Sequence, residues 1–198
     1  MQYSNRNFLI HPHYIMMYLM LAGITALFLG FSAAYLYNRV EQGLPPVKIP
    51  WLFYSNSLLL LGSSFFLHRA KKNYLEDDTE QYKRSIAMAL SLTVLFLIAQ
   101  IFAWYQMQQD NIAINHSTMA SYLYLISILH FAHVFGGIPF LAAFLITAIR
   151  KMKTPVSVLV YFSDVDKKRK LDLLNLYWHF LDGLWIYLVI FFLINYLI

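Results

Sequence analysis

The chain has 198 residues, of which 60% are hydrophobic, 18% are aromatic and only 13% are charged, and its formal net charge is +5. A soluble domain of this length cannot bury so much apolar surface, so the composition excludes an ordinary soluble enzyme and predicts an integral membrane protein. The complete lack of cysteine excludes disulfides, thiolate metal sites and a dicopper centre held by thiolates within this chain.

Long apolar segments predict five transmembrane helices. About 20 apolar residues span the hydrocarbon core of a bilayer. Residues 111–149 carry no charge, which is too long for one crossing and too short for two. We expect that segment to cross from about Thr118 to about Pro139 and then to project beyond the membrane. The predicted helices cover residues 14–38, 51–67, 85–107, 118–149 and 173–196, joined by a short turn and by charged loops at 68–84 and 150–172.

No repeat, low-complexity tract or long linker divides the chain, so we predict one all-α bundle, a single domain over residues 1–198. Five crossings place the termini on opposite sides of the membrane. With the N-terminus inside, thirteen Lys and Arg residues face inward and only Arg39 and Lys48 face outward. The positive-inside rule therefore predicts an N-in, C-out topology. The basic clusters are topology determinants in this interpretation, which argues against a nucleic-acid partner.

Asp182 is the only acidic residue inside a predicted span, where a carboxylate is costly and usually faces a partner. His179 lies three residues before it and shares its helix face. The fourth span carries a second pair, His130 and His133. Polar side chains also lie in the second and third spans, where Asn56 and Gln100 are typical of hydrogen bonding between helices.

Four roles for these polar groups are open. Haem ligation would have to involve His179, because His130 and His133 lie only about 4.5 Å apart along one helix and cannot bind one haem axially. A di-iron site lacks enough ligands, although a single zinc or iron ion stays geometrically possible. A proton or substrate path is the third role. Structural pairing between helices is the fourth, and we favour it over direct proton transfer.

Depth along the helices predicts a specific pair. Asp182 lies about nine residues, or roughly 13 Å, past the start of the fifth span, and His133 lies about six residues, or roughly 9 Å, before the end of the fourth. Gly136-Gly137 would allow these helices to approach closely. We therefore predict that Asp182 hydrogen-bonds a histidine, His133 or His179, and fixes the packing of the fourth and fifth spans.

Several stretches resemble subunit III of the haem–copper respiratory oxidases, which act on cytochrome c or quinol. Residues 177–185 resemble the YWHFVDxxW signature of that family, and residues 130–136 are similar to its HGLHVxxG signature. Residues 56–64 resemble its NTxxLLxSS stretch, and residues 96–100 and 33–35 match weaker signatures. The resemblance covers all five predicted spans in order and corresponds to the short five-helix bacterial form.

Two positions depart from the family pattern. Ile24 stands where the family usually has a glutamate, and Ala103 stands where its Gln-x-x-Glu-aromatic pattern has one. Any role of those carboxylates, such as storing a proton, is therefore not expected here.

The resemblance implies an accessory subunit with no haem, metal or catalytic residue of its own, in a bacterial inner membrane. Its implied partners are catalytic subunit I, subunit II and phospholipids, and its implied roles are to support proton uptake and durability during turnover. The alternative is a small membrane haem protein or an accessory subunit of a nitric oxide reductase. Aromatic and basic residues near the membrane surfaces suit lipid headgroups; the candidates are Trp51, Tyr54, Arg69, Lys83, Arg84 and Tyr177.

Overall fold

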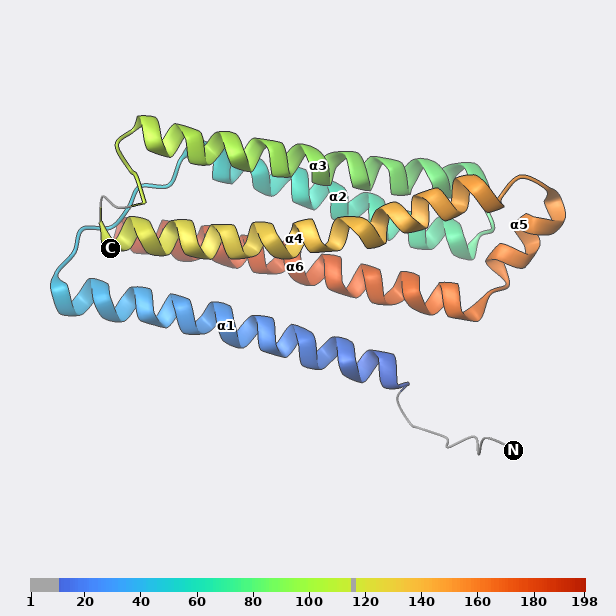
Figure 1. Cartoon of the computed structure of the whole chain (residues 1–198), viewed down its shortest axis with the longest axis horizontal. Coiled ribbons are helices and arrows are strands. Elements are labelled where there is room, and N and C mark those ends of the chain that lie inside the picture. Colours follow the sequence, from blue (N-terminus) through green and yellow to red (C-terminus); the bar gives the residue numbers. More distant parts are fainter. Residues whose placement is uncertain (1–10, 115–116) are drawn as a thin grey trace.

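The computed structural model describes residues 11–114 and 117–198, and these residues form six α-helices (Figure 1). Five are long and run antiparallel to one another in chain order, and the short α5 joins α4 to α6 at one end of the bundle. That end is called the α5 end, and the opposite one the C-terminal end. The helices are α1 (Pro12–Gln42), α2 (Trp51–Leu75), α3 (Thr79–Gln109), α4 (Thr118–Lys151), α5 (Pro155–Phe162) and α6 (Val165–Leu197).

Helix ends follow local capping chemistry. The Asp78 carboxylate accepts from the backbone N–H of Gln81 at the start of α3, and the Ser117 hydroxyl accepts from Ala120 N–H at the start of α4. Asp164 caps the first turn of α6 by accepting from two backbone N–H groups. These caps satisfy backbone donors that the first helical turn leaves unpaired.

The two charged loops are shorter than predicted. Residues 68–84 are almost entirely helical, because α2 continues to Leu75 and α3 already begins at Thr79. Residues 150–172 contain the whole of α5 and the first two turns of α6. An apolar segment ends where the side chains become polar, whereas a helix ends where its backbone hydrogen bonds end. A helix that projects into water is therefore longer than its apolar segment.

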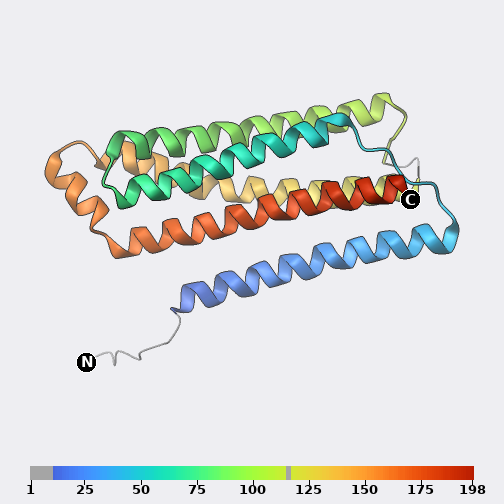
Figure 2. The same ribbon diagram turned by 180° about the vertical axis from the view of Figure 1, so that it is seen from behind.

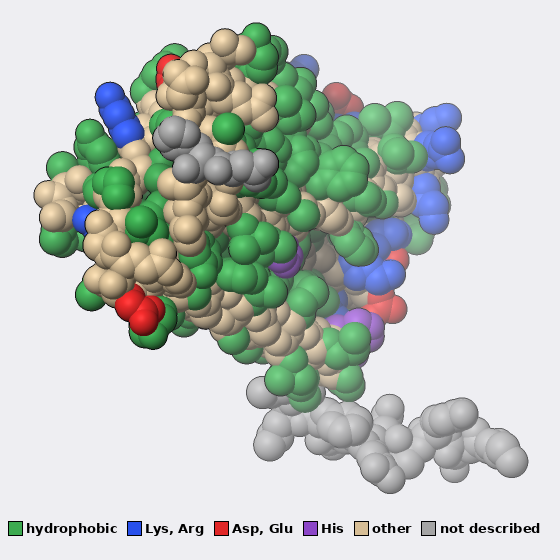
Figure 3. Space-filling model, turned by 60° about the vertical axis from the view of Figure 1, so that its left-hand side comes forward, with side chains coloured by type: hydrophobic (Ala, Val, Ile, Leu, Met, Phe, Trp, Pro, Cys, Tyr) green, Lys and Arg blue, Asp and Glu red, His purple; other side chains and the backbone are tan. Residues whose placement is uncertain are grey.

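Four helices of the described chain, α1, α3, α4 and α6, are long and apolar enough to cross a membrane. The predicted span in α2 is not among them, because serines and Asn56 lower its hydropathy. Lys and Arg side chains gather at the α5 end, at the right of Figure 3, and hydrophobic side chains cover much of the remaining visible surface. This all-helical architecture is that of a multi-pass membrane protein.

The helices differ in how deeply they pack. The helices α2 and α3 pack along each other, and α6 contacts both α2 and α4 (Figures 1 and 2). The helix α1 lies at the edge of the bundle against α4 and α6, and its N-terminal part diverges from them. A large apolar core fills the centre and the C-terminal end, and a second core with Tyr74, Tyr82 and Tyr161 lies at the α5 end.

Candidate functional site: a buried polar seam

Polar contacts follow the whole interface between α2 and α6, which we call the polar seam. Two indole N–H groups donate to serine hydroxyls, and one imidazole nitrogen bonds a third serine. An ion pair ends the seam at the α5 end. In order towards that end, the pairs are Ser57 with Trp185 (3.2 Å), Ser63 with Trp178 (3.2 Å), Ser64 with His179, and Lys71 with Asp172 (2.8 Å).

A second set of polar contacts joins α2 to α3. Asn56 Nδ2 donates to Gln100 Oε1 at 2.8 Å, and both side chains are fully buried. The Ser63 hydroxyl also lies 2.8 Å from the Thr93 hydroxyl. Such interhelical hydrogen bonds are worth about 0.6–2 kcal/mol each in membrane proteins. The amides singled out from the sequence therefore meet each other in the centre of the bundle.

The two histidines of α4 have separate environments. His130 is fully buried, and its Nε2 donates to the Leu181 carbonyl of α6 at 3.1 Å, so the neutral ring carries its proton there. Its ring packs 4.9 Å from that of Trp185. His133 is half-buried, and its Nδ1 donates to the carbonyl of Leu129 in its own helix at 2.6 Å.

The predicted hydrogen bond from Asp182 to a histidine is wrong. Asp182 is only 4% exposed, and neither carboxylate oxygen has a hydrogen-bond partner in the described part of the chain. The seam explains why. Its pairs follow an antiparallel arrangement, in which residue numbers rise along α2 from Ser57 to Lys71 while they fall along α6 from Trp185 to Asp172. Asp182 lies between His179 and Trp185 in α6, and the hydroxyl of Ser64, the neighbouring polar group of α2, bonds His179 instead.

The predicted close approach of α4 and α6 at Gly136 and Gly137 is confirmed at Gly137 but not at Gly136. A Cβ atom at Gly137 would lie 2.6 Å from the Trp178 ring, whereas one at Gly136 would meet no atom within 4 Å. The Tyr177 hydroxyl donates to the His133 carbonyl at 2.8 Å in the same region. Trp178, rather than Asp182, is therefore the α6 side chain that sets this contact.

The six candidate lipid-contact residues do not form one site. Trp51, Tyr54, Arg69 and Arg84 are exposed at separate places along α2 and α3. Lys83 instead donates to the Met152 carbonyl at 3.4 Å. Tyr177 lines a cavity of about 480 Å³ between α1, α4 and α6. The other lining residues are Met17, Met20, Phe140, Phe144, Lys170, Leu173 and Leu174.

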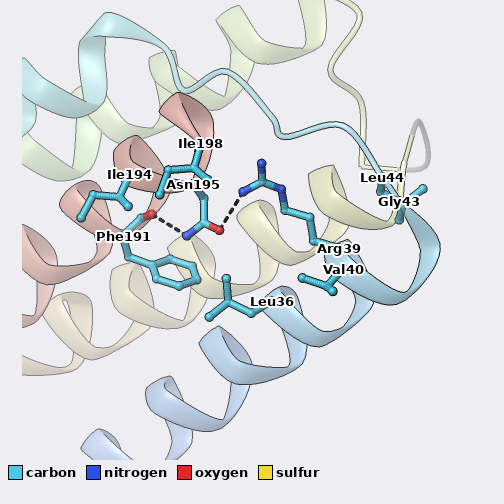
Figure 4. Close-up of a pocket in the computed structure, with 9 residues that line it drawn as sticks. All are labelled: Leu36, Arg39, Val40, Gly43, Leu44, Phe191, Ile194, Asn195 and Ile198. Atoms are coloured by element: carbon cyan, nitrogen blue, oxygen red, sulfur yellow. Dashed lines mark hydrogen bonds between the residues drawn. The ribbon is translucent and has the colours of Figure 1, made fainter.

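A further cavity of about 590 Å³ lies at the C-terminal end, between the last turns of α1 and α6. Figure 4 shows Arg39 reaching from α1 towards Asn195 of α6, where its guanidinium donates to Asn195 Oδ1 at 3.0 Å. Asn195 Nδ2 in turn donates to the Phe191 carbonyl at 2.8 Å. These bonds attach the end of α1 to α6.

Within the part of the chain that the structure describes, no three His, Asp or Glu side chains converge closely enough to hold a metal ion. The sequence matches the family described as cytochrome c oxidase subunit III over residues 15–196, which is nearly the whole chain. The chain belongs to this family. It is therefore a subunit of an oxidoreductase complex, with partner subunits, and the polar seam lies within a subunit III fold.

Three curated relatives carry the name cytochrome c oxidase subunit 3. The protein from Synechocystis sp. is 26% identical, with 87% of this chain and 71% of the relative covered. The protein from Thermostichus vulcanus is 24% identical, with 90% and 86% covered. The protein from Corynebacterium diphtheriae is 22% identical, with 82% and 78% covered. This chain is thus similar to them over most of their length.

Sequence reasoning missed the partners of Trp178 and Trp185. The two indoles are seven residues apart and so share a helix face, but their partners Ser57 and Ser63 are six residues apart, so the spacing alone does not pair them. The tyrosine cluster at the α5 end was missed as well. Tyr74 donates to the Tyr161 carbonyl at 3.0 Å, and the Tyr82 and Tyr161 hydroxyls lie 3.3 Å apart. Nothing in the spacing of these three residues indicates that contact.

Proposed function

We propose that this chain is the non-catalytic accessory subunit of a proton-pumping haem–copper terminal oxidase in a bacterial inner membrane. In this proposal it packs on catalytic subunit I, belongs to the same complex as subunit II, and supports the reduction of oxygen to water. The observation that carries the proposal is the family match over residues 15–196. The redox centres would belong to the partner subunits.

In the proposed topology the N-terminus faces inward and five helices cross the membrane: α2 crosses in addition to the four helices that are apolar enough by composition. The position of α2 supports this, because it lies along α3 and α6, which are both apolar enough to span, and bonds its polar side chains to them. The distribution of charge supports the orientation, because Lys and Arg are concentrated at the α5 end. Cysteines introduced at Asn73 and Asn111 should label from opposite sides of the membrane.

We also propose that the cavity between α1, α4 and α6 holds a phospholipid. Its lining is apolar, as an acyl chain requires, and Lys170 lies at its edge, where a phosphate could be bound. Further support comes from α1, whose N-terminal part diverges from the rest of the bundle (Figure 1). A bound lipid in this position would fill the space between α1 and the remaining helices.

The proposed contribution to proton uptake and durability is indirect. The buried polar groups His130, Asp182, Asn56 and Gln100 each keep at least one atom without a protein partner in the described chain, so they can hold internal water. This supports a hydrated interior beside the catalytic subunit, and a structural role for the polar residues within it.

Affinity purification through a tag on this chain tests the proposed function. The expected preparation contains the catalytic subunit, absorbs as haem and reduces oxygen, and deletion of the chain should leave an enzyme that loses activity faster during turnover. A haem spectrum from the isolated chain would contradict the proposal and support the membrane haem protein. Nitric oxide reduction without oxygen reduction would contradict it in favour of the reductase.

A further inference from the structure

We propose that the outward face of α2 and α6 docks a transmembrane helix of the catalytic subunit, and that this helix offers a hydrogen-bonding side chain to His179. This inference rests on the proposed function, because it requires a membrane complex. The docking face consists of Leu58, Leu61, Phe65 and His68 of α2, with His179, Gly183 and Ile190 of α6, all of them exposed. Figure 2 shows α2 and α6 side by side on this side of the bundle.

The feature that distinguishes this face is a pair of exposed imidazoles. His179 bonds Ser64 through Nδ1, and that is the only hydrogen bond its ring forms within the described part of the chain. Its Nε2 is therefore left for another molecule. The ring of His68, also exposed, lies 6.1 Å from that of His179 between centroids.

The depth of His179 excludes a simple contact with lipid headgroups. Its partner Ser64 lies seven residues, or about 10 Å, along α2 from Lys71, whose ion pair with Asp172 we place at the membrane surface because both groups are charged. In the other direction Ser64 lies thirteen residues, or about 20 Å, from the exposed Trp51. Acyl chains at this depth offer no hydrogen-bond partner, and an unpaired polar group there is costly.

The outward face of α3 provides the contrast. Its large exposed side chains include Leu95, Ile98 and Phe102, and no Lys, Arg, His, Asp or Glu occurs between Met88 and Tyr105. That composition suits acyl chains. The docking face has the same apolar background but adds His68 and His179, which suit a protein helix with a polar side chain.

Gly183 indicates how closely the partner can approach. It is exposed one turn from His179, and a Cβ atom at this position would meet nothing within 4 Å. Small residues on the surface of a transmembrane helix allow another backbone to come near. Gly183 therefore leaves room for a second helix beside an imidazole nitrogen that has no partner in the described part of the chain.

The test compares two substitutions in the tagged oxidase. Gly183→Leu adds bulk to the docking face without disturbing the packing of this chain, and Gly30→Leu does the same on α1, where the glycine is equally open. We expect Gly183→Leu to lower the amount of catalytic subunit recovered with the tagged chain severalfold, and Gly30→Leu to leave it unchanged. Unchanged recovery with Gly183→Leu, or an equal loss with Gly30→Leu, would overturn the inference.

Histidine substitutions test the polar contact. His179→Gln keeps a hydrogen-bonding group, whereas His179→Leu removes it, and the loss of one interhelical bond should lower recovery by roughly 3- to 30-fold relative to Gln. Equal recovery of both variants would contradict the polar contact. Failure of the unsubstituted chain to recover any catalytic subunit would instead contradict the proposed function, so the two failures are distinguishable.

The absence of cysteine allows a direct check. A photoactivatable maleimide attached at Leu61→Cys should cross-link to the catalytic subunit of the assembled oxidase, and the same reagent at Ile98→Cys on α3 should not. Cross-linking to lipid alone from both positions would show that the docking face is covered by lipid and would overturn the inference.

Discussion

The helices α1 and α2 have opposite relations between hydropathy and burial. α1 is apolar enough to span a membrane, yet only five of its 31 residues are buried. α2 is not among the helices that are apolar enough to span a membrane, yet nine of its 25 residues are buried, including Asn56, Ser63 and Ser64. Between these two helices, hydropathy therefore does not follow burial. The polar side chains of α2 are buried because they bond neighbouring helices, and hydrocarbon offers such groups no partner.

The largest expected effect comes from the tight contact at Gly137. Gly137→Ala would place a Cβ atom 2.6 Å from the Trp178 ring, which is buried and bonded to Ser63, so the ring cannot move freely. We expect the free energy of unfolding to fall by about 1–3 kcal/mol. Unfolding in a detergent series, followed by tryptophan fluorescence, measures this. The matched control is Gly30→Ala on α1, where the added atom meets nothing, and an equal loss there would remove the contrast between the two helices.

The buried amide pair should give the next largest effect. Asn56→Leu removes the hydrogen bond to Gln100 and leaves that fully buried amide without its partner. We expect the free energy of unfolding to fall by about 1–2 kcal/mol. The double variant Asn56→Leu/Gln100→Leu should recover much of this loss, since no amide is then left unpaired. Additive losses in the same unfolding assay would show that the two amides act independently.

A polar contact of α1 should matter less. Asn38 Nδ2 donates to the Tyr122 hydroxyl of α4 at 3.0 Å, in a half-buried position. We expect Asn38→Leu to lower the free energy of unfolding by about 0.5 kcal/mol, since water or detergent headgroups can replace a half-exposed bond. The neighbouring control Val40→Ala alters a side chain that is 82% exposed, and it should have no effect. A loss of stability as large as that of Asn56→Leu would show that this contact of α1 contributes as much to the free energy of unfolding as the buried amide pair, which would contradict the prediction.

The smallest effect concerns Asp164 at the α5 end, outside the spans. The Lys167 side chain beside it holds the pKa of this carboxyl below its usual range. The ionised cap therefore stabilises α6 fully above the ordinary aspartate pKa of about 4, and this contribution is lost as pH falls through the lowered value. Asp164→Asn should flatten the dependence of unfolding on pH between about 6 and 3. Lys168, one residue beyond Lys167, is exposed and forms no ion pair within the described residues, so Lys168→Gln is a suitable control.

Much of the bundle could be predicted from the chain. The apolar segments locate the five long helices, and Asn56 and Gln100 stand out as groups that need a partner inside the bundle. The ends of the helices could not be found in the same way, because Asp78, Thr154 and Asp164 cap helices in segments that are charged rather than apolar. The predicted partner of Asp182 was wrong for a different reason, since depth along a helix does not fix the direction in which it faces.

The sequence by itself determined that this protein is an all-helical member of the subunit III family. The tertiary structure alone decided which groups meet. The register of α2 against α6 pairs Ser63 with Trp178 and Ser64 with His179, and it leaves Asp182 without a hydrogen-bond partner in the described part of the chain. The physical reason is that composition and periodicity act within one helix, whereas a hydrogen bond between helices depends on their rotation and axial offset. Those two quantities are set by close contacts such as that of Gly137 with Trp178.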